Sequence, residues 1–578
     1  MTLGEILFQV QKPGRYLGNE LNSVHKDPGG MFRAVIAYPD LYEIGASNLG
    51  ISILYHRLNK EEDIWCERAF APGPDLEKAL RSSGLPLFSL ESRTPLRDFS
   101  LVGFSLQYEL TFPQVLNMLE LGKIPLRTAE RGPEDPVVVA GGPCTANPEP
   151  MAPFFDALHI GDGEEAILEI VQTVKEFRGK KSRDRHELHL ALSRIPGVYV
   201  PVLYEPMYSE SGMISDWKID KAAPWPVPVR RVKDLDSAYF PALPVLPGIE
   251  IVHDRAQVEL FRGCVRGCRF CQAGFVYRPR RFRSPEKVVF LAREILKNTG
   301  WEELGLVSLS TCDYSGLEQV IEGLRPYLSE KKVQISLPSL RADSFSVKMA
   351  RLAQGNRITL TFAPEAGTQR LREVIGKDLS EEEIKEAIKL AAQYGFERVK
   401  LYFMVGLPKE EDEDLEEIVS LVIKLNQIAK SISRKVHLSI SCSAFVPKPQ
   451  TPFQWERMEE LHQLKRKRLF VRSNLEKRGI EVGGQKEELS FLEGVIARGD
   501  RRIAGLIEEA WKNGSRLDGW SDYFSFPVWQ EAMSQAGIDP AFYLYREREK
   551  DEVLPWSGVR YAAGLEYLWR ERERAYRG

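Results

Sequence analysis

Residues 261–275 constrain this chain most, because Cys264, Cys268 and Cys271 fall within eight positions in a CxxxCxxC spacing. Three thiolates on one short loop can hold three corners of a cubane iron–sulfur cluster, whose usual protein shell is four cysteines. The fourth iron is then left without a protein ligand. A vacant coordination position distinguishes a reactive metal centre from a structural one. The loop also follows residues 256–261, which alternate like a strand, so we expect the cysteines at the carboxyl end of a strand.

Two other interpretations of the three cysteines are a structural zinc loop and a disulfide. A zinc site normally has four ligands, often supplied by two CxxC pairs, and this loop has neither a second pair nor a nearby histidine. Three cysteines cannot all pair. Seven cysteines in 578 residues is sparse usage, which is typical of a reducing compartment. The sequence therefore favours an open cluster.

These residues resemble the radical SAM superfamily, whose motif is CxxxCxΦC with an aromatic residue at Φ, here Phe270. The resemblance implies that the open iron chelates the amino and carboxylate groups of S-adenosylmethionine (SAM). It further implies that the reduced cluster donates an electron, that the sulfonium breaks homolytically to a 5'-deoxyadenosyl radical, and that this radical abstracts hydrogen from a substrate.

The length of the chain predicts about three domains, and its composition is that of an ordinary globular protein. We expect an α/β protein with four parts: a Rossmann-like domain of the cobalamin-binding type (1–177), a linker (178–249), a partial (βα)6 barrel (250–455) and a mainly helical C-terminal segment (456–578). The linker is predicted from its proline spacing at 222–229, which favours an extended connector.

The first part alternates short apolar runs with helical stretches, and the run at 137–142 ends in Gly141 and Gly142. Glycines at a strand's carboxyl end permit a ligand to approach the backbone closely, although they also make plain tight turns. This region resembles the cobalamin-binding domains fused before many radical SAM domains, so the ligand expected there is cobalamin. None of the eight histidines lies in the DxHxxG string that donates an axial ligand; His159 comes closest, with the wrong spacing. Cobalamin without a protein histidine and an empty domain both remain open.

The barrel is predicted from six strand-like runs separated by amphipathic stretches, which indicates a parallel sheet. The runs lie at 256–261, 304–310, 333–337, 357–362, 398–404 and 436–441. Six such units match the partial barrel of the radical SAM family. In a parallel barrel the chemistry gathers at the carboxyl ends of the strands.

The resemblance implies that residues at these strand ends contact SAM, with the motif's aromatic residue beside them. The expected cofactor-binding set is Phe270, Ser310, Thr311, Asp313, Arg341, Glu365, Met404 and Gly406, with Gly141 and Gly142 in the first domain. Each has a plain alternative, such as a helix cap for Ser310 or an ion pair for Glu365. No catalytic residue is assigned. Cys312 and Cys442 are read as buried thiols, and no cysteine follows Cys442, so no second cluster is expected.

The leading hypothesis is a radical SAM enzyme with one [4Fe-4S] cluster, possible cobalamin-dependent methyl transfer, and a one-electron reductant as partner. Two basic runs, at 277–283 and 465–468, leave RNA or protein open as a substrate, although each also fits a solvated or ligand-neutralising role. The alternative is a non-catalytic iron–sulfur binding or sensor protein. The first ten residues carry an early acid, and no apolar run is long enough to cross a bilayer, so we expect no signal peptide, no membrane and a cytoplasmic location.

Overall fold

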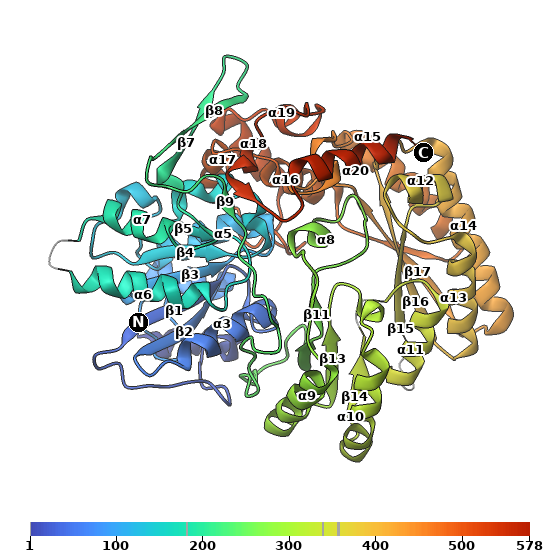
Figure 1. Cartoon of the computed structure of the whole chain (residues 1–578), viewed down its shortest axis with the longest axis horizontal. Helices are drawn as coiled ribbons and strands as arrows, with labels where there is room; N and C mark the ends of the chain where they lie inside the picture. The colour runs from blue at the N-terminus through green and yellow to red at the C-terminus, as the bar shows by residue number, and fades with distance from the viewer. Residues whose placement is uncertain (1, 181–182, 338–339, 355–358, 578) are drawn as a thin grey trace.

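The computed structural model describes residues 2–180, 183–337, 340–354 and 359–577. Its N-terminal part is built on a six-stranded sheet in the order β2-β1-β3-β4-β5-β6, with β6 alone antiparallel (Figure 1). The strands are β1 (Phe32–Tyr38), β2 (Ile64–Phe70), β3 (Leu101–Ser105), β4 (Val137–Gly141), β5 (Ala157–His159) and β6 (Val198–Tyr199). All seven residues of β2 are buried, as in a sheet covered on both faces.

Helices follow most strands of this sheet, which gives the doubly wound pattern predicted from the sequence. They include α3 (Leu49–Asn59), α4 (Pro74–Ser83), α5 (Phe112–Leu121) and α6 (Ala166–Gly179). Asn48 caps α3 through its side chain, which accepts a hydrogen bond from the Ile51 amide. Because the first five strands run in parallel, their carboxyl ends share one edge of the sheet, where connecting loops can form a ligand site.

The stretch 178–249, which we predict to be a linker, contains regular structure in its first half. Helix α7 (Arg185–Ser193) leads into β6, and β7 (Tyr204–Tyr208) and β8 (Ile214–Ile219) form a hairpin. Further on, β9 (Val227–Pro228) pairs with β19 (Val559–Arg560) near the end of the chain. The proline-rich segment is therefore tied to the C-terminal part.

The barrel strands follow the predicted order and pair in parallel, but they fall into two sheets. The first is β10-β13-β14 and the second is β15-β16-β17-β18. The strands are β10 (Ala256–Glu259), β13 (Glu303–Val307), β14 (Gln334–Ser336), β15 (Thr359–Glu365), β16 (Arg398–Val405), β17 (His437–Ala444) and β18 (Glu481–Gly483). The seventh strand was not foreseen, and residues 357 and 358 of the predicted fourth strand lie outside the described residues.

Helices between the strands form the outer wall of this half-open barrel, which extends from the bottom centre of Figure 1 to its right side. They are α9 (Pro285–Thr299), α10 (Leu317–Lys331), α11 (Ser344–Gln354), α13 (Glu381–Gln393) and α14 (Asp412–Ile432). Along β16, Val399, Leu401 and Phe403 are buried, whereas Tyr402 between them is 38% exposed. This alternation puts one face of the sheet against the helices and the other toward an open interior.

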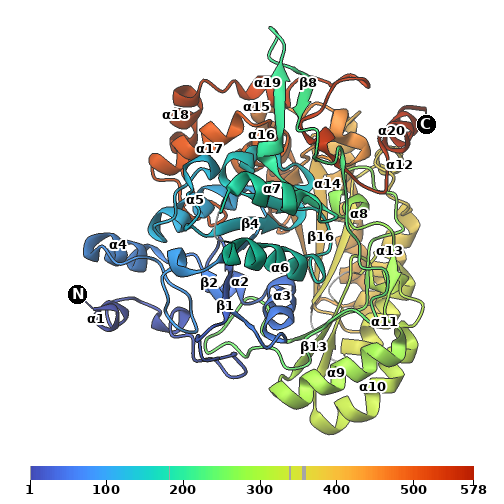
Figure 2. The same cartoon turned by 60° about the vertical axis from the view of Figure 1, so that its left-hand side comes forward.

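The C-terminal part is mainly helical, as predicted, and crosses the top of both α/β halves in Figure 1. Its helices are α15 (Leu461–Glu476), α16 (Glu487–Ala497), α17 (Ile503–Lys512), α18 (Phe526–Ala536), α19 (Pro540–Leu544) and α20 (Leu565–Arg577). In Figure 2 the same helices lie above the N-terminal sheet. Among the described residues, no helix combines the length and apolar character that a membrane span requires.

Candidate functional site

The three cysteines lie on the loop between β11 (Phe261–Arg262) and the short helix α8 (Gln272–Val276), in the middle of Figure 1. Each cysteine is half-buried and has a free thiol that forms no disulfide. The amide of Arg266 donates to Cys264 Sγ at 3.4 Å, the kind of hydrogen bond that tunes cluster thiolates. Gly263, before the first cysteine, has a φ of +87°, and a Cβ there would lie 2.8 Å from the Tyr277 carbonyl oxygen. The loop therefore needs glycine at this position.

The far side of the loop is fixed to the barrel by α12 (Gln369–Val374) and the turn after it. The Arg269 amide donates to the Ile375 carbonyl at 2.8 Å, and its guanidinium donates to the carbonyls of Glu373 and Val374. Gly376 packs on Gly267 so closely that a Cβ would lie 2.7 Å from the Gly267 carbonyl oxygen. The loop is thus anchored to the barrel by several backbone contacts.

The residues present fit a cubane cluster. Burial raises the pKa of Cys268, and it raises that of Cys271 to about 11, with the neighbouring thiols adding to the effect in both cases. The three sulfurs are therefore close enough to feel one another's charge, which binding to iron would relieve. In the described part of the chain no three His, Cys, Asp or Glu side chains are gathered around a point suited to a single metal ion. A cubane cluster does not need its ligands gathered around one point, since each thiolate binds a different iron atom.

Asp313, at the end of the second barrel strand, is joined to the cysteine loop. Arg266, between Cys264 and Cys268, donates to Asp313 Oδ2 at 2.9 Å and makes a second bond to Oδ1, while the Ser310 hydroxyl donates to Oδ2 at 2.6 Å. Burial opposes ionisation of Asp313, but the hydrogen bonds from Arg266 and Ser310 outweigh it and lower its pKa. Asp313 therefore lies beside the loop as a carboxylate whose orientation is fixed by Arg266 and Ser310.

Glu365, at the end of β15, also lies close to the cysteines. Its φ of +71° is unusual for a residue other than glycine, and its carboxylate pairs with Lys377 at 3.3 Å. Burial raises the pKa of Glu365, with Lys377 acting in the opposite direction, and its charge acts on Cys268 and Cys271. A strained, buried carboxylate next to a reactive loop is characteristic of a binding site.

Phe270 and Met404 share one apolar cluster with Ala366, Leu407 and Phe445. The aromatic residue of the cysteine motif and the residue on β16 thus pack against the same apolar cluster. Gly406, just beyond β16, has a φ of +78°, and its amide donates to Glu410 at 2.9 Å. A Cβ there would lie 2.6 Å from Leu464 Cδ2, so this turn also requires glycine.

Two other predicted contacts already have partners in the protein. Arg341 donates to the Asp378 carbonyl at 2.7 Å and pairs with Asp343 at 3.1 Å. Thr311 is fully buried, and its hydroxyl lies 3.1 Å from that of Ser308. These interactions occupy both side chains with the protein itself, so neither is free to contact a cofactor in this arrangement.

A cavity of about 400 Å³ separates the N-terminal sheet from the start of the cysteine loop. Its wall comes from the carboxyl ends of β3 and β4, from α3, and from the barrel residues just before Cys264. Apolar residues dominate it, including Ile53, Leu54 and Phe261. Gly141 and Gly142 both line it; at Gly142 φ is +115°, and a Cβ would lie 2.4 Å from the Leu106 carbonyl oxygen. The predicted glycine pair thus allows close packing of backbone at the cavity wall.

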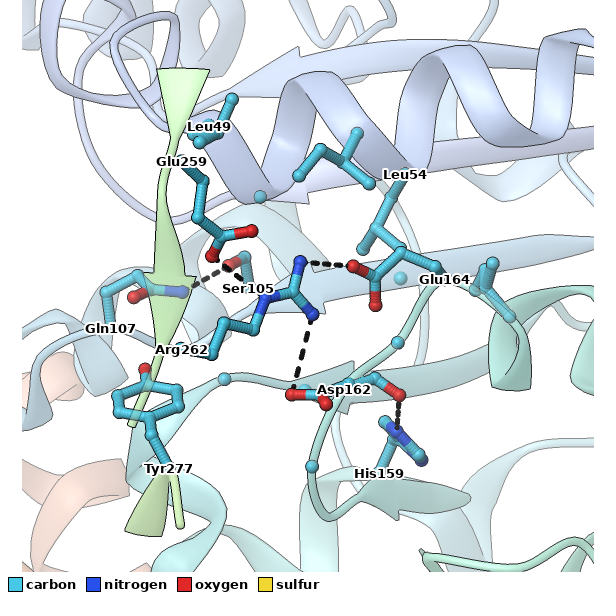
Figure 3. A pocket seen from close by; sticks show the side chains of 18 of the residues that line it. Leu49, Leu54, Ser105, Gln107, His159, Asp162, Glu164, Glu259, Arg262 and Tyr277 are labelled. Carbon is cyan, nitrogen blue, oxygen red and sulfur yellow. Dashed lines mark hydrogen bonds and ion pairs between the residues drawn. The ribbon is translucent and has the colours of Figure 1, made fainter. Parts of the chain in front are cut away.

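Charged residues join the two domains along this cavity (Figure 3). Arg262 binds Glu164, and it also donates to Glu259 at 2.8 Å and lies 3.6 Å from Asp162. Arg281 binds the same Asp162. The acids of the turn at 161–165 therefore hold barrel arginines. This pairing could not be predicted from the sequence, because the partners lie about a hundred positions apart.

His159 also lines the cavity, and its surroundings keep it neutral. Burial lowers its pKa to about 4, and its Nε2 lies 2.9 Å from the Asp162 carbonyl oxygen, to which the neutral ring donates. Nδ1 is buried and has no hydrogen-bond partner. In Figure 3 the ring lies beneath the Asp162 turn, on the opposite side from Arg262.

Sequence reasoning missed Arg266, Lys377 and the Asp162 turn. Arg266 offered one signal, since it is a cation inside the cysteine loop that would need a carboxylate once the loop folds. Asp313, at a strand end, was the natural candidate. Lys377 lies beyond α12 and gave no comparable signal.

Family models agree with this geometry. Residues 50–201 match the model described as "Radical SAM proteins, N-terminal", and residues 258–422 match the model of the radical SAM superfamily. The chain belongs to the radical SAM superfamily. Both α/β parts of this radical SAM protein are thus covered by models of the same superfamily, which implies a [4Fe-4S] cluster and SAM as its cofactors.

Its sequence relatives include several proteins with named activities. An uncharacterised protein of Methanocaldococcus jannaschii is 29% identical over 83% of this chain and 92% of its own length. An uncharacterised methyltransferase of Pyrococcus horikoshii is 26% identical over 51% of this chain and 59% of its own. The ribosomal protein uS12 methylthiotransferase of Pelotomaculum thermopropionicum is 25% identical over 46% of this chain and 61% of its own length.

Among solved structures, similarity is weaker. The cobalamin-dependent radical enzyme OxsB, with aqua-cobalamin and S-adenosylmethionine bound, has 13% identity and a TM-score of 0.47, covering 88% of this chain and 71% of its own. The methyltransferase TsrM of Kitasatospora setae, with tryptophan and a SAM analogue bound, has 14% identity and a TM-score of 0.46, with coverage of 74% and 75%.

Proposed function

We propose that this protein binds a [4Fe-4S] cluster through Cys264, Cys268 and Cys271 and uses it to cleave SAM. The observation that carries the proposal is the cysteine loop itself, held open at the carboxyl ends of the barrel strands beside Asp313 and Glu365. When bound, the cluster would supply the electron that cleaves SAM, and the 5'-deoxyadenosyl radical so released would abstract hydrogen from the substrate. A one-electron reductant must then reduce the cluster again.

The surrounding side chains hold the loop and offer charges for SAM. Arg266 keeps Asp313 ionised, and Ser310 orients one of its oxygens, so this pair can accept from the ammonium of the methionine moiety. Glu365, buried with Lys377, can accept from ribose hydroxyls. Phe270 and Met404 supply an apolar wall on which an adenine can pack.

Anaerobic incubation of the reconstituted protein with SAM and dithionite tests this proposal. Formation of 5'-deoxyadenosine supports the enzyme. A bound cluster without any SAM cleavage would instead support the alternative, a non-catalytic iron–sulfur or sensor protein.

A second, finer proposal is that the cavity between the domains holds part of a cobalamin. It lies at the carboxyl edge of the N-terminal sheet and opens beside Gly263, and its volume of about 400 Å³ suits a section of such a ligand rather than all of it. Gly141 and Gly142 would allow the ligand close to the backbone, with Ser105 and Gln107 as polar contacts. Bound cobalamin would supply a methyl group for transfer. Retention of hydroxocobalamin by the full-length protein after desalting tests this; free elution at micromolar concentration would refute it.

For the substrate, the methylthiotransferase relatives suggest RNA or ribosomal protein, but the two basic runs do not support RNA. Arg281 and Arg283 are buried, and Arg278 stacks on Phe275. In α15, every cation of the run 465–468 pairs with a carboxylate. Arg280 is the one exposed cation of the first run, and it lies over the Phe282 ring. Little surface charge is therefore left for phosphate binding, and a protein substrate is the better-supported proposal.

A further inference from the structure

Two arginines are buried where the C-terminal helices meet the rim of the barrel. Arg498, directly after α16, is 0% exposed, and Arg548, in the loop after α19, is 3% exposed. Arginine keeps its proton at any relevant pH, so each carries a full positive charge out of water. Within the described ranges, no carboxylate forms an ion pair with either.

The hydrogen bonds that these arginines make are all to backbone carbonyls. Arg498 donates to the carbonyls of Tyr543, at 2.8 Å, and of Pro447 and Gln454, at 3.3 and 3.2 Å. Arg548 donates to the carbonyl of Arg498 at 2.9 Å. The charge of Arg548 also acts unfavourably on that of Arg498, and carbonyl dipoles do not cancel two whole charges.

Several N–H groups around this arginine pair have no acceptor at all. They are Nη2 of Arg498, Nε and Nη1 of Arg548, and the amide nitrogen of Gln454. The groups belong to one network: Gln454 Oε1 accepts from Trp556 Nε1 at 2.7 Å, and Arg548 lies over the Trp556 ring. All the unsatisfied atoms of this network are donors. What the site lacks is therefore an acceptor.

Arg372 shows how the same fold accommodates a buried arginine that needs no ligand. It is 0% exposed and donates to the carbonyls of Leu379, Ala366 and Gly367 and to the side chain of Gln369, all within 3.0 Å. None of its nitrogens is left without a partner. A single buried arginine can thus be satisfied by carbonyls, whereas the Arg498–Arg548 pair is not.

The nearest carboxylates are already occupied. Glu552 binds Arg546 with two bonds of 2.7 Å, and Asp500 binds Arg502 at 2.6 Å. Glu456 accepts from Arg572 and Tyr576. Moving any of them toward the arginine pair would leave another cation or hydroxyl unpaired. Burial, together with Arg548 and Arg546, lowers the pKa of Arg498, and the charges of Glu552 and Glu456 offset this only in part.

We propose that a small inorganic anion, either a halide or a tetrahedral oxyanion, binds at the free N–H groups of Arg498, Arg548 and Gln454. Water could satisfy single N–H groups but would leave both charges uncompensated in the interior. The anion would stabilise the contact between the C-terminal part and the barrel, because Arg498, directly after α16, donates to the carbonyls of Pro447 and Gln454 at the barrel rim. The site is separate from the cluster loop and does not depend on SAM chemistry.

Thermal unfolding of the full-length protein, in one fixed cluster state, tests the site. Sodium chloride and sodium sulfate are each compared with sodium glutamate, whose anion is bulkier, at equal ionic strength. We expect at least one small anion to raise Tm by about 3 °C between 5 and 100 mM, as binding to the native state alone requires. The salt that acts identifies the class of anion. An identical response to all three salts would overturn the proposal.

Two variants separate binding from general salt effects. Arg548→Met should lose the anion-specific rise, whereas Arg372→Met, which removes an equally buried arginine, should keep it. Retention of the full rise in Arg548→Met contradicts the site. If Arg548→Met does not fold, crystals of the wild-type protein soaked in bromide decide the matter: an anomalous peak beside Arg498 Nη2 supports an anion, and water alone there refutes it.

Discussion

The barrel and the N-terminal sheet both present the carboxyl ends of parallel strands toward the middle of the molecule, but they fill that edge with different chemistry. The barrel edge carries three thiols, a carboxylate held by Arg266 and a buried Glu365–Lys377 pair. The sheet edge carries glycines and apolar side chains around a cavity. Parallel topology thus determines where a site forms, and the side chains at the strand ends determine whether it reacts or only binds.

The two edges also meet. Arg262, two positions before Cys264, binds Glu164 and Glu259, so one residue connects the cavity wall with the start of the cysteine loop. A ligand in the cavity would therefore lie next to the reactive loop. Changes at the barrel edge should abolish chemistry, whereas changes at the sheet edge should alter binding and stability.

The largest effect is expected from Cys268→Ala. Losing one of three thiolates should remove the cluster and abolish 5'-deoxyadenosine formation. Visible absorbance, iron content and product analysis measure this outcome. Cys442→Ala, which changes a fully buried thiol on β17, should keep both cluster and product. Cluster absorbance that survives in Cys268→Ala would show that the loop is not the cluster site.

Asp313→Asn should reduce SAM cleavage at sub-saturating SAM about a hundredfold, because it leaves Arg266 without its charged partner and removes an acceptor for the substrate ammonium. Kinetics with the cluster content matched to wild type measure this. Asp343→Asn, which breaks the Arg341 pair instead, should have a much smaller effect. A kcat/KM within threefold of wild type for Asp313→Asn would remove Asp313 from the site.

At the sheet edge, His159→Gln should make stability less sensitive to acid. The folded-state pKa is about 4, below the ordinary value of 6.5, so the unfolded chain takes up more protons between these values. The stability due to the neutral ring is therefore present above pH 6.5 and is lost as pH falls toward 4.

Between pH 7.5 and 5 the wild type should lose about 2 kcal/mol through this group, and His159→Gln should not, since glutamine can still donate to the Asp162 carbonyl. Urea unfolding at both pH values measures the difference. His462→Gln, which changes an exposed ring, is the control. If His159→Gln and the wild type lose the same free energy of unfolding between pH 7.5 and 5, the neutral state assigned to His159 is contradicted.

The smallest effect is expected from filling the cavity. Leu54→Trp should weaken retention of hydroxocobalamin about tenfold, because the larger side chain occupies the space beside Gly163. Leu168→Trp, on α6, which packs against α3, lies outside the cavity wall and should leave retention unchanged. Cluster absorbance should be the same in both. Equal retention in the two variants would mean that the ligand binds elsewhere.

Much of the fold was predictable, because the cysteine spacing and the alternation of apolar runs with amphipathic stretches are local signals. The order of the barrel strands and the glycine pair at the end of β4 are confirmed by the structure. Strand β18 was missed because its three residues are too few to show a pattern. The pairings of Arg266 with Asp313 and of Arg262 with Glu164 join positions far apart in the chain, and only the folded structure brings them together.

Electron paramagnetic resonance of the dithionite-reduced, reconstituted protein, with and without SAM, tests the central claim most directly. An iron atom without a protein ligand should bind SAM, so we predict a [4Fe-4S]⁺ signal whose g-values shift when SAM is added. A signal that SAM leaves unchanged, or zinc in place of iron at Cys264, Cys268 and Cys271, would contradict it.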